Sequence, residues 1–276
     1  MRIAPSRLEK TMILLMNTPV YRTIWISDLH IGSTQCQVDS LLDFLKHNES
    51  EKLYLVGDII DFWSLSKKMY WPQEHNTVIQ KILRKARHGT QIIYIPGNHD
   101  ENIRDYDNHV FGGIVVKNSD IHTTKLGKRF LIVHGDEYDT IAKHHQWLAK
   151  LGSVGYDLLI DINRFLRFIR HMFGVRSNFS LAAFVKFKVK NVVQFISDYE
   201  SSIVQTLKNS NLDGVICGHI HHAEIKYIDD FLYINTGDFV ESCTAIVEHQ
   251  DGSLALIRWM KQEVQELPAV SSFEAN

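Results

Sequence analysis

The sequence predicts an α/β protein whose core strands run parallel, with a helical insertion in the second half of the chain. Short apolar runs typical of strands alternate with amphipathic helical patterns over the first hundred residues. A long stretch of helical spacing then separates the fourth strand-like run from the fifth. With 276 residues, 45% of them hydrophobic and 22% charged, the chain has enough apolar material for one large domain that carries an insertion.

Six four-residue runs have the continuous apolar, β-rich character of strands buried on both faces. They are residues 23–26, 53–56, 92–95, 130–133, 214–217 and 231–234. Two helical stripes separate the first three runs, one from Val38 to Leu45 and one from Val78 to Ala86, with Gly89 as a stop signal. The order β-α-β-α-β predicts parallel strands. Near the end, residues 244–247 and 254–257 flank Asp251-Gly252, which suits the turn of a β-hairpin.

We therefore expect a core formed by residues 21–139 and 211–260, interrupted by a helical insertion at 140–210. Residues 1–20 are expected to be an N-terminal extension and 261–276 a C-terminal tail. The formal charge of -2 hides a segregation, because residues 162–197 hold seven basic residues and no acidic one. These are Arg164, Arg167, Arg170, Arg176, Lys186, Lys188 and Lys190. The rest of the chain carries 23 basic and 32 acidic residues, a charge of -9.

The three cysteines favour a reducing compartment. Cys36, Cys217 and Cys243 are odd in number and far apart, so neither a disulfide framework nor a thiolate zinc site is indicated. The apolar run at 12–16 is too short for the core of a signal peptide. No window approaches the roughly 20 apolar residues of a membrane-spanning helix. We expect a cytoplasmic protein that can still lie on a membrane surface.

A polar cluster follows each of the six predicted strands. The clusters are Asp28-Leu29-His30, Gly57-Asp58-Ile59-Ile60-Asp61, Gly97-Asn98-His99-Asp100, His134-Gly135-Asp136, Gly218-His219-Ile220-His221 and Asn235-Thr236-Gly237-Asp238. Because open α/β sheets carry their sites at the carboxyl ends of strands, we expect the clusters to converge on one edge. Their alternation in Asp28-x-His30 and His219-x-His221 is typical of an extended backbone, in which residues i and i+2 project to the same side.

The clusters predict a metal centre. Seven candidate ligands stand out: Asp28, His30, Asp58, Asn98, His134, His219 and His221. Oxygen and nitrogen ligands without a thiolate fit Mn, Fe or Zn better than Ca, and seven ligands suit two divalent ions that share a bridging carboxylate. Any one cluster could be only a loop cap or a turn, but that explanation does not account for all of them in this order.

These motifs resemble the complete motif set of the calcineurin-like metallophosphoesterases, over about residues 23–247. The resemblance implies a four-layer α-β-β-α sandwich. It implies one metal site formed by Asp28, His30, Asp58 and His221, and another formed by Asp58, Asn98, His134 and His219. Asp58 would bridge the two ions, which would activate a water for attack on phosphorus. His99 would stabilise the transition state or protonate the leaving oxygen, oriented by Asp61.

Within the superfamily the chain is most similar to the UDP-2,3-diacylglucosamine pyrophosphohydrolases of lipid A synthesis. The similarity is carried by Asp61-Phe62-Trp63, by Tyr70-Trp71-Pro72-Gln73-x-His75-Asn76 and by the residues that follow Gly218 and Asn235. It implies hydrolysis of the substrate's diphosphate by a metal-bridging hydroxide to UMP and 2,3-diacylglucosamine 1-phosphate, with Mn as the expected metal. The insertion would be a helical lid over the acyl chains. Members with the best-established activity carry Arg where this chain has His99, which indicates a His-bearing branch whose substrate can differ.

The insertion itself has two interpretations. Its phenylalanines among seven cations resemble an amphipathic element that enters a membrane interface, with Arg164, Arg167 and Arg170 as candidate contacts for an anionic substrate. It could equally be a helical hairpin packed on the core with a solvated basic face. Nucleic acid is not expected, because aromatic residues at helical core spacing do not form stacking platforms. Two alternatives to the main hypothesis stay open: a phosphodiesterase or other nucleotide-sugar pyrophosphatase, and a non-catalytic scaffold, although such scaffolds lose ligands that this chain keeps.

Overall fold

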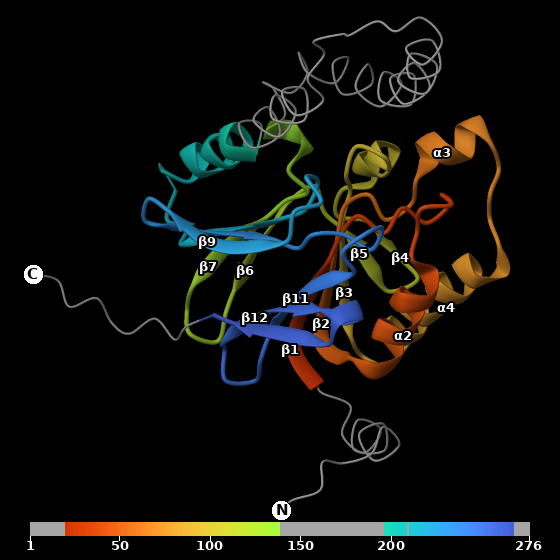
Figure 1. Ribbon diagram of the computed structural model, residues 1–276, viewed down its shortest axis with the longest axis horizontal. Coiled ribbons are helices and arrows are strands. Elements are labelled where there is room, and N and C mark those ends of the chain that lie inside the picture. Colours follow the sequence, from red (N-terminus) through yellow and green to blue (C-terminus); the bar gives the residue numbers. More distant parts are fainter. Residues whose placement is uncertain (1–19, 139–195, 209, 268–276) are drawn as a thin grey trace, which may run out of the picture. The chain divides into compact units, whose positions relative to one another are not determined.

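The computed structural model describes residues 20–138, 196–208 and 210–267 (Figure 1). The chain divides into two compact units, Met1–Asp136 with Thr206–Asn276, and Glu137–Gln205. Most of the predicted insertion, including Arg164, Arg167 and Arg170, lies outside the described residues, and its described part is helical from residue 196 to 207. Among the described residues no helix combines the length and apolar character needed to cross a bilayer.

The larger unit contains an eight-stranded sheet with the order β13-β12-β11-β1-β2-β3-β5-β4. Its strands are β1 (Val20–Ile26), β2 (Glu49–Val56), β3 (Gln91–Ile95), β4 (Val110–Phe111), β5 (Ile114–Val116), β11 (Thr244–Glu248), β12 (Leu254–Arg258) and β13 (Glu263–Glu266). Strands β1, β2, β3 and β5 are parallel, whereas β11 and β12 form the predicted antiparallel hairpin. The sheet continues past residue 260, since β13 pairs with β12 within the expected tail.

A second, five-stranded sheet has the order β6-β7-β8-β10-β9. It consists of β6 (Asp120–Thr123), β7 (Arg129–Ile132), β8 (Gly214–Cys217), β9 (Glu224–Ile228) and β10 (Phe231–Asn235). All six predicted strands are therefore present, but three belong to each sheet. The expectation that the six clusters share the edge of one sheet is wrong, because runs buried on both faces do not reveal which strands pair.

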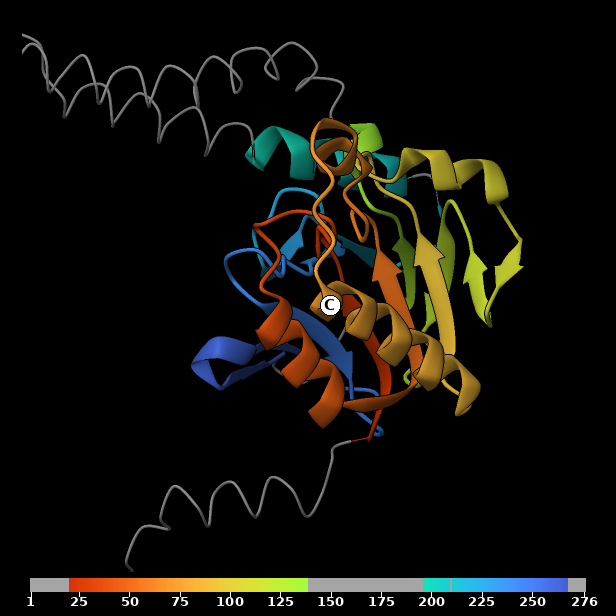
Figure 2. The ribbon, with the colours of Figure 1, turned by 90° about the vertical axis from the view of Figure 1, so that its right-hand side faces the viewer.

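Helices cover one face of the larger sheet. Figure 2 shows α2 (Val38–His47) and α4 (Gln73–Arg87) side by side against the strands. Their apolar stripes, represented by Phe44 and Val78, are fully buried in one core cluster. Each helix carries basic residues in its last turn, which complements the helix dipole, and α4 is followed by Gly89 at a φ of 104°. The shorter α3 (Phe62–Lys67) links β2 to α4.

The second core lies between the two sheets. Trp25, Tyr54 and Ile93 of the larger sheet belong to one buried cluster with Phe130 and Ile234 of the smaller one. The two sheets pack their apolar faces against each other. Polar loops therefore gather at the carboxyl ends of the parallel strands, outside this core. The larger unit is thus an α/β sandwich with helices on one outer face.

Candidate metal centre

Loops from both sheets bring the predicted ligands together. Three groups of side chains place their ligand atoms within 4.8 Å of one another. They are Asp28 with His30 and His221, His30 with Asp58 and His99, and Asp58 with His134 and His219. The first and third groups contain six of the seven ligands expected from the sequence, and Asp58 connects the second group to the third.

The backbone at these ligands is left-handed, not extended. Asp28, His30, Asp58, His219 and His221 have φ values between 48° and 73°. The predicted alternation in Asp28-x-His30 and His219-x-His221 is therefore wrong: β1 ends at Ile26 and β8 at Cys217, before these residues begin. For residues other than glycine this conformation costs about 1–3 kcal/mol each and persists where the surroundings enforce it, most often at functional sites.

The loop after β1 is held by its neighbours. The N–H of Asp28 donates to the carbonyl of Gly57 at 3.0 Å, and the N–H of His30 donates to that of Asp58 at 2.9 Å. Asp28 is fully buried, with Oδ1 at 3.2 Å from Nε2 of His221. Although burial opposes its charge, the hydrogen bond from His221 lowers the pKa of Asp28. The Ser27 hydroxyl donates to Asp28 Oδ2, a supporting role that nothing in the sequence signals.

Asp58 lies between the two groups of ligands. Its Oδ2 is 3.8 Å from Nε2 of His30 and 3.5 Å from Nε2 of His134. The Nδ1 atom of His134 lies 3.0 Å from the carbonyl of Val56, and because a carbonyl only accepts, this nitrogen carries the proton and Nε2 faces the site. Burial opposes protonation of His134, but the charges of Asp58 and Asp28 outweigh it and raise its pKa to about 10.

The donor set fits divalent cations. Nε2 of His30, Oδ1 of Asn98 and Nε2 of His134 are buried, and none has a well-formed hydrogen bond to another described residue. Leaving such atoms unsatisfied costs about 1–3 kcal/mol each, which a bound cation would offset. Gly97 permits the close packing, since a Cβ at this position would overlap Oδ1 of Asp58. Carboxylate, amide and imidazole ligands without thiolate suit Mn, Fe or Zn.

His99 lies beside this group and is oriented by Asp61. Its Nδ1 is 2.9 Å from Asp61 Oδ1, and its Nε2 is 3.9 Å from Asp58 Oδ2. Burial opposes its charge, but the hydrogen bond to Asp61 and the charge of Asp58 raise the pKa of His99. Burial also opposes ionisation of Asp61, and its hydrogen bonds to His30 and His99 nevertheless lower its pKa. The arrangement can present a positively charged donor next to the metal ligands.

Asp100 organises the loops around the site. This fully buried carboxylate accepts the Ile59 N–H at 2.8 Å, the Gly97 N–H at 2.5 Å and the Tyr94 hydroxyl at 2.5 Å. It therefore ties the loop after β2 to the loop after β3. Asp100, which ends the third polar cluster of the sequence, is therefore a loop cap in the structure. Asp136 likewise turns away from the ligands to pair with Arg104 at 2.7 Å.

Asn235 and Asp238 support the loops of the second sheet. The Asn235 amide donates to the carbonyl of Gly218 at 2.7 Å, next to His219. Asp238 Oδ1 accepts backbone N–H groups of its own loop, including that of Val240 at 2.7 Å. The sixth polar cluster could be recognised in the sequence, but its residue types alone do not distinguish a side chain that supports a loop from one that binds a metal.

The two tryptophans near the site differ. Trp63 is 40% exposed and its ring lies 4.2 Å from that of His99. Trp71 packs against the core and donates to Asn76 at 2.9 Å.

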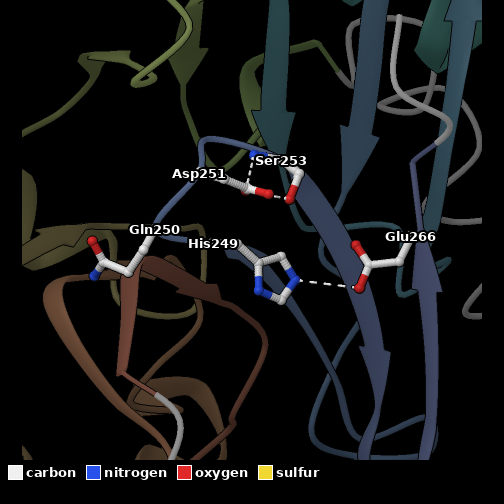
Figure 3. A pocket seen from close by; sticks show the side chains of 5 residues that line it. All are labelled: His249, Gln250, Asp251, Ser253 and Glu266. Carbon is white, nitrogen blue, oxygen red and sulfur yellow. Dashed lines mark hydrogen bonds and ion pairs between the residues drawn. The ribbon is translucent and has the colours of Figure 1, made fainter.

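A separate open hollow is lined by His249, Gln250, Asp251, Ser253 and Glu266 at the β11–β12 turn (Figure 3). It contains none of the predicted ligands and presents no comparable group of converging donors.

Several known proteins are similar to this chain. The profile of the calcineurin-like phosphoesterases matches residues 21–223. UDP-2,3-diacylglucosamine hydrolase of Haemophilus influenzae is 25% identical over 251 residues, which cover 85% of this chain and 98% of that protein. The protein of the same name from Psychromonas ingrahamii is 26% identical over 208 residues, covering 72% and 80%. Among solved structures, Yfce, a phosphoesterase from E. coli, is 14% identical with a TM-score of 0.45, covering 89% of this chain and 97% of that one.

Proposed function

Because the chain belongs to the calcineurin-like phosphoesterase family of metal-dependent hydrolases, we propose that it hydrolyses the diphosphate of UDP-2,3-diacylglucosamine. The products are UMP and 2,3-diacylglucosamine 1-phosphate. The observation that supports this substrate most strongly is the match to relatives named UDP-2,3-diacylglucosamine hydrolase over nearly their whole length. The substrate would be a nucleotide-linked glycolipid, and the chain would act in lipid A synthesis.

Two divalent cations, with Mn as the expected metal, would activate a water and neutralise charge on the phosphoryl oxygens. Asp28, His30, Asp58 and His221 would hold one, and Asp58, Asn98, His134 and His219 the other. This assignment is supported by the triads of ligand atoms within 4.8 Å and by the buried side-chain atoms of His30, Asn98 and His134 that form no well-formed hydrogen bond to another described residue. Asp58 would bridge the two sites, since it approaches both His30 and His134.

His99 would act on the phosphoryl group being transferred. Asp61 fixes its ring through Nδ1, so Nε2 remains available to a phosphate oxygen next to Asp58. A protonated His99 would stabilise charge on that oxygen or donate a proton to the leaving group. Asp61 would be the positioning residue that keeps this imidazole charged and oriented.

The chain would meet its substrate at the cytoplasmic face of a membrane. The diacyl chains of the proposed substrate belong in a bilayer, and the basic residues of the insertion suit anionic headgroups or the diphosphate. Arg164, Arg167 and Arg170 are the candidate contacts in this insertion.

A second candidate is a metallophosphoesterase of different substrate, either a phosphodiesterase or another nucleotide-sugar pyrophosphatase. The presence of His99 favours the phosphodiesterase, because general-acid help is most useful when the leaving group is a basic alkoxide. The phosphate monoester that leaves when a diphosphate is hydrolysed needs less such help. Both reactions would use the same metal ligands, so the substrate must be identified by measuring activity.

A substrate panel tests the proposal. Purified protein with added Mn is assayed for UMP release from UDP-2,3-diacylglucosamine and from UDP-N-acetylglucosamine, and for cleavage of a chromogenic phosphodiester. We expect Mn-dependent UMP release from the diacylated substrate at a higher kcat/KM than from the sugar without acyl chains. Cleavage of the diester without UMP release from the glycolipid would reject the substrate and leave the phosphoesterase activity standing.

A further inference from the structure

The last residue of α3 and the three residues that follow it form an exposed tip: Lys67, Lys68, Met69 and Tyr70. The Met69 side chain is 75% exposed and that of Tyr70 39%. The chain has no acidic residue between Asp61 and Glu74, and within the described part of the chain neither lysine forms an ion pair. The tip therefore combines exposed apolar groups with two uncompensated positive charges.

The base of this tip is held firmly on both sides. Asp61 caps α3, accepting the Ser64 N–H at 2.7 Å. At the other end of the tip, the ring of Tyr70 lies 5.6 Å from that of His75, edge to face, and His75 Nδ1 accepts the Gly32 N–H at 3.1 Å. The exposed apolar side chains are thus displayed by a fixed part of the fold.

The short helix α3 connects the tip to the metal centre. Asp61, which caps α3, is the residue that orients His99 at 2.9 Å. At the start of α3, the half-exposed Trp63 ring lies 4.2 Å from that of His99. A partner that covers the tip would consequently bind one end of α3, whose other end carries Asp61 beside His99.

We propose that this tip contacts the headgroup region of an anionic lipid bilayer and so brings the metal centre to the membrane surface. The benefit of this contact for catalysis rests on the proposed function, in which the substrate is lipid-linked. Tyr and Trp rings with one polar end favour the membrane–water interface. Each lysine close to an anionic surface strengthens binding by about 1 kcal/mol, which corresponds to about fivefold in partitioning. The two lysines together contribute roughly 25-fold.

Charge and size distinguish the bilayer from other occupants. The chain's own insertion carries seven basic residues and no acidic one between residues 162 and 197, so it would repel Lys67 and Lys68. A second copy needs about 800 Å² on each partner for a stable interface, far more than four tip residues supply. An extended anionic surface satisfies both requirements, because it attracts the lysines and admits the apolar side chains.

Vesicle sedimentation tests the contact with the full chain loaded with Mn. Binding is measured to phosphatidylcholine vesicles with and without phosphatidylglycerol. The double variant Lys67→Gln with Lys68→Gln should bind anionic vesicles roughly 25-fold more weakly, and Met69→Ser should weaken binding further. The matched controls are Lys46→Gln with Lys261→Gln, and Met260→Ser, where Met260 is 60% exposed and lies just after β12. Cleavage of a water-soluble chromogenic diester should stay unchanged in all of them.

The outcomes separate this inference from the proposed substrate. Tip variants that bind anionic vesicles as tightly as the unmodified protein overturn the contact, even if UDP-2,3-diacylglucosamine is hydrolysed. If the tip variants lose vesicle binding but the unmodified protein does not hydrolyse the glycolipid, the contact is supported and the substrate is rejected. A concentration-dependent dimer in sedimentation velocity that disappears in Met69→Ser would overturn the bilayer in favour of a second copy.

Discussion

Oδ1 of Asp61 lies 2.9 Å from Nδ1 of His99, while its Oδ2 lies 3.2 Å from Nδ1 of His30. One carboxylate therefore orients both an expected metal ligand and the residue expected to act on the substrate. The same carboxylate caps the N-terminus of α3, so this helix and the two histidines depend on one position of the Asp61 side chain. This shared role makes His99, which is not an expected ligand, the more selective position for testing catalysis.

His99→Asn should lower kcat by about 10²–10⁴-fold while leaving bound Mn unchanged. The loss should be greater for a diester with an alkyl leaving group than for one with a nitrophenyl leaving group, because only the basic alkoxide needs a proton. Steady-state kinetics and metal analysis of the same preparation measure both effects. Full activity of the variant would contradict the assigned role of His99. Loss of one metal equivalent would instead show that His99 is a ligand, which is geometrically feasible because its ligand atom lies within 4.8 Å of those of His30 and Asp58.

Asp100→Asn should weaken Mn binding by about 10–100-fold. In either orientation of the Asn amide, its nitrogen would face an N–H group that now donates to the carboxylate, that of Ile59 or that of Gly97. Isothermal titration with Mn measures the affinity. Asp136→Asn is the matched control, since the side chain of Asp136 pairs with that of Arg104. Equal affinities for the two variants would contradict the positioning role of Asp100.

Gly97→Ala should reduce activity by displacing Asp58. The new Cβ would overlap Oδ1 of Asp58, which also accepts the His99 N–H at 2.8 Å. Gly127→Ala is the control: its Cβ would meet nothing within 4 Å, although Gly127 has a φ of 81° and the variant is strained. Comparing diester cleavage with thermal unfolding separates the two effects. We expect Gly97→Ala to lose activity and metal, and Gly127→Ala to lose stability alone.

Glu248→Gln should destabilise the fold by about 1–3 kcal/mol at neutral pH. Glu248 is fully buried on β11 and accepts His122 Nε2 of β6 at 2.8 Å, which joins the two sheets. Burial opposes ionisation of Glu248, but the hydrogen bonds from His122 and Lys125 outweigh it and lower its pKa below the ordinary 4.5. A lowered pKa stabilises the fold above pH 4.5, and this contribution is lost as pH falls through the folded-state pKa.

Urea unfolding at several pH values measures this contribution. The difference between the unmodified protein and Glu248→Gln should be greatest near neutrality and should narrow below pH 4.5. The exposed Glu266→Gln is the control and should change stability little. A difference that stays constant down to pH 3 would show that charge on Glu248 is not the cause.

The sequence predicted the strands and helices that carry strong apolar patterns. The elements it missed are short or exposed: β4 consists of two exposed residues, and the residues of β13 are all exposed. Such edge strands have no buried face, so no hydrophobic period marks them. The division into two sheets was missed for a related reason, because strands buried on both faces give no sign of which neighbours they pair with.

The candidate ligands could be recognised because Asp, Asn and His follow apolar runs, but their backbone conformation could not. The left-handed φ of Asp28 or Asp58 is enforced by hydrogen bonds from other loops, such as that between Asp28 and Gly57. The support given by Ser27 and Asp100 is equally non-local. Residue type at a strand end indicates a ligand, whereas the groups that position it become visible only when the loops are brought together.

Anomalous diffraction from crystals soaked in Mn tests the central claim, a two-metal centre formed by loops of both sheets, most directly. The account predicts two peaks roughly 3.5–4 Å apart that share Asp58, one beside His30 and His221 and the other beside His134 and His219. Asp58→Asn should weaken both peaks. A single peak, or peaks away from these side chains, would contradict the account.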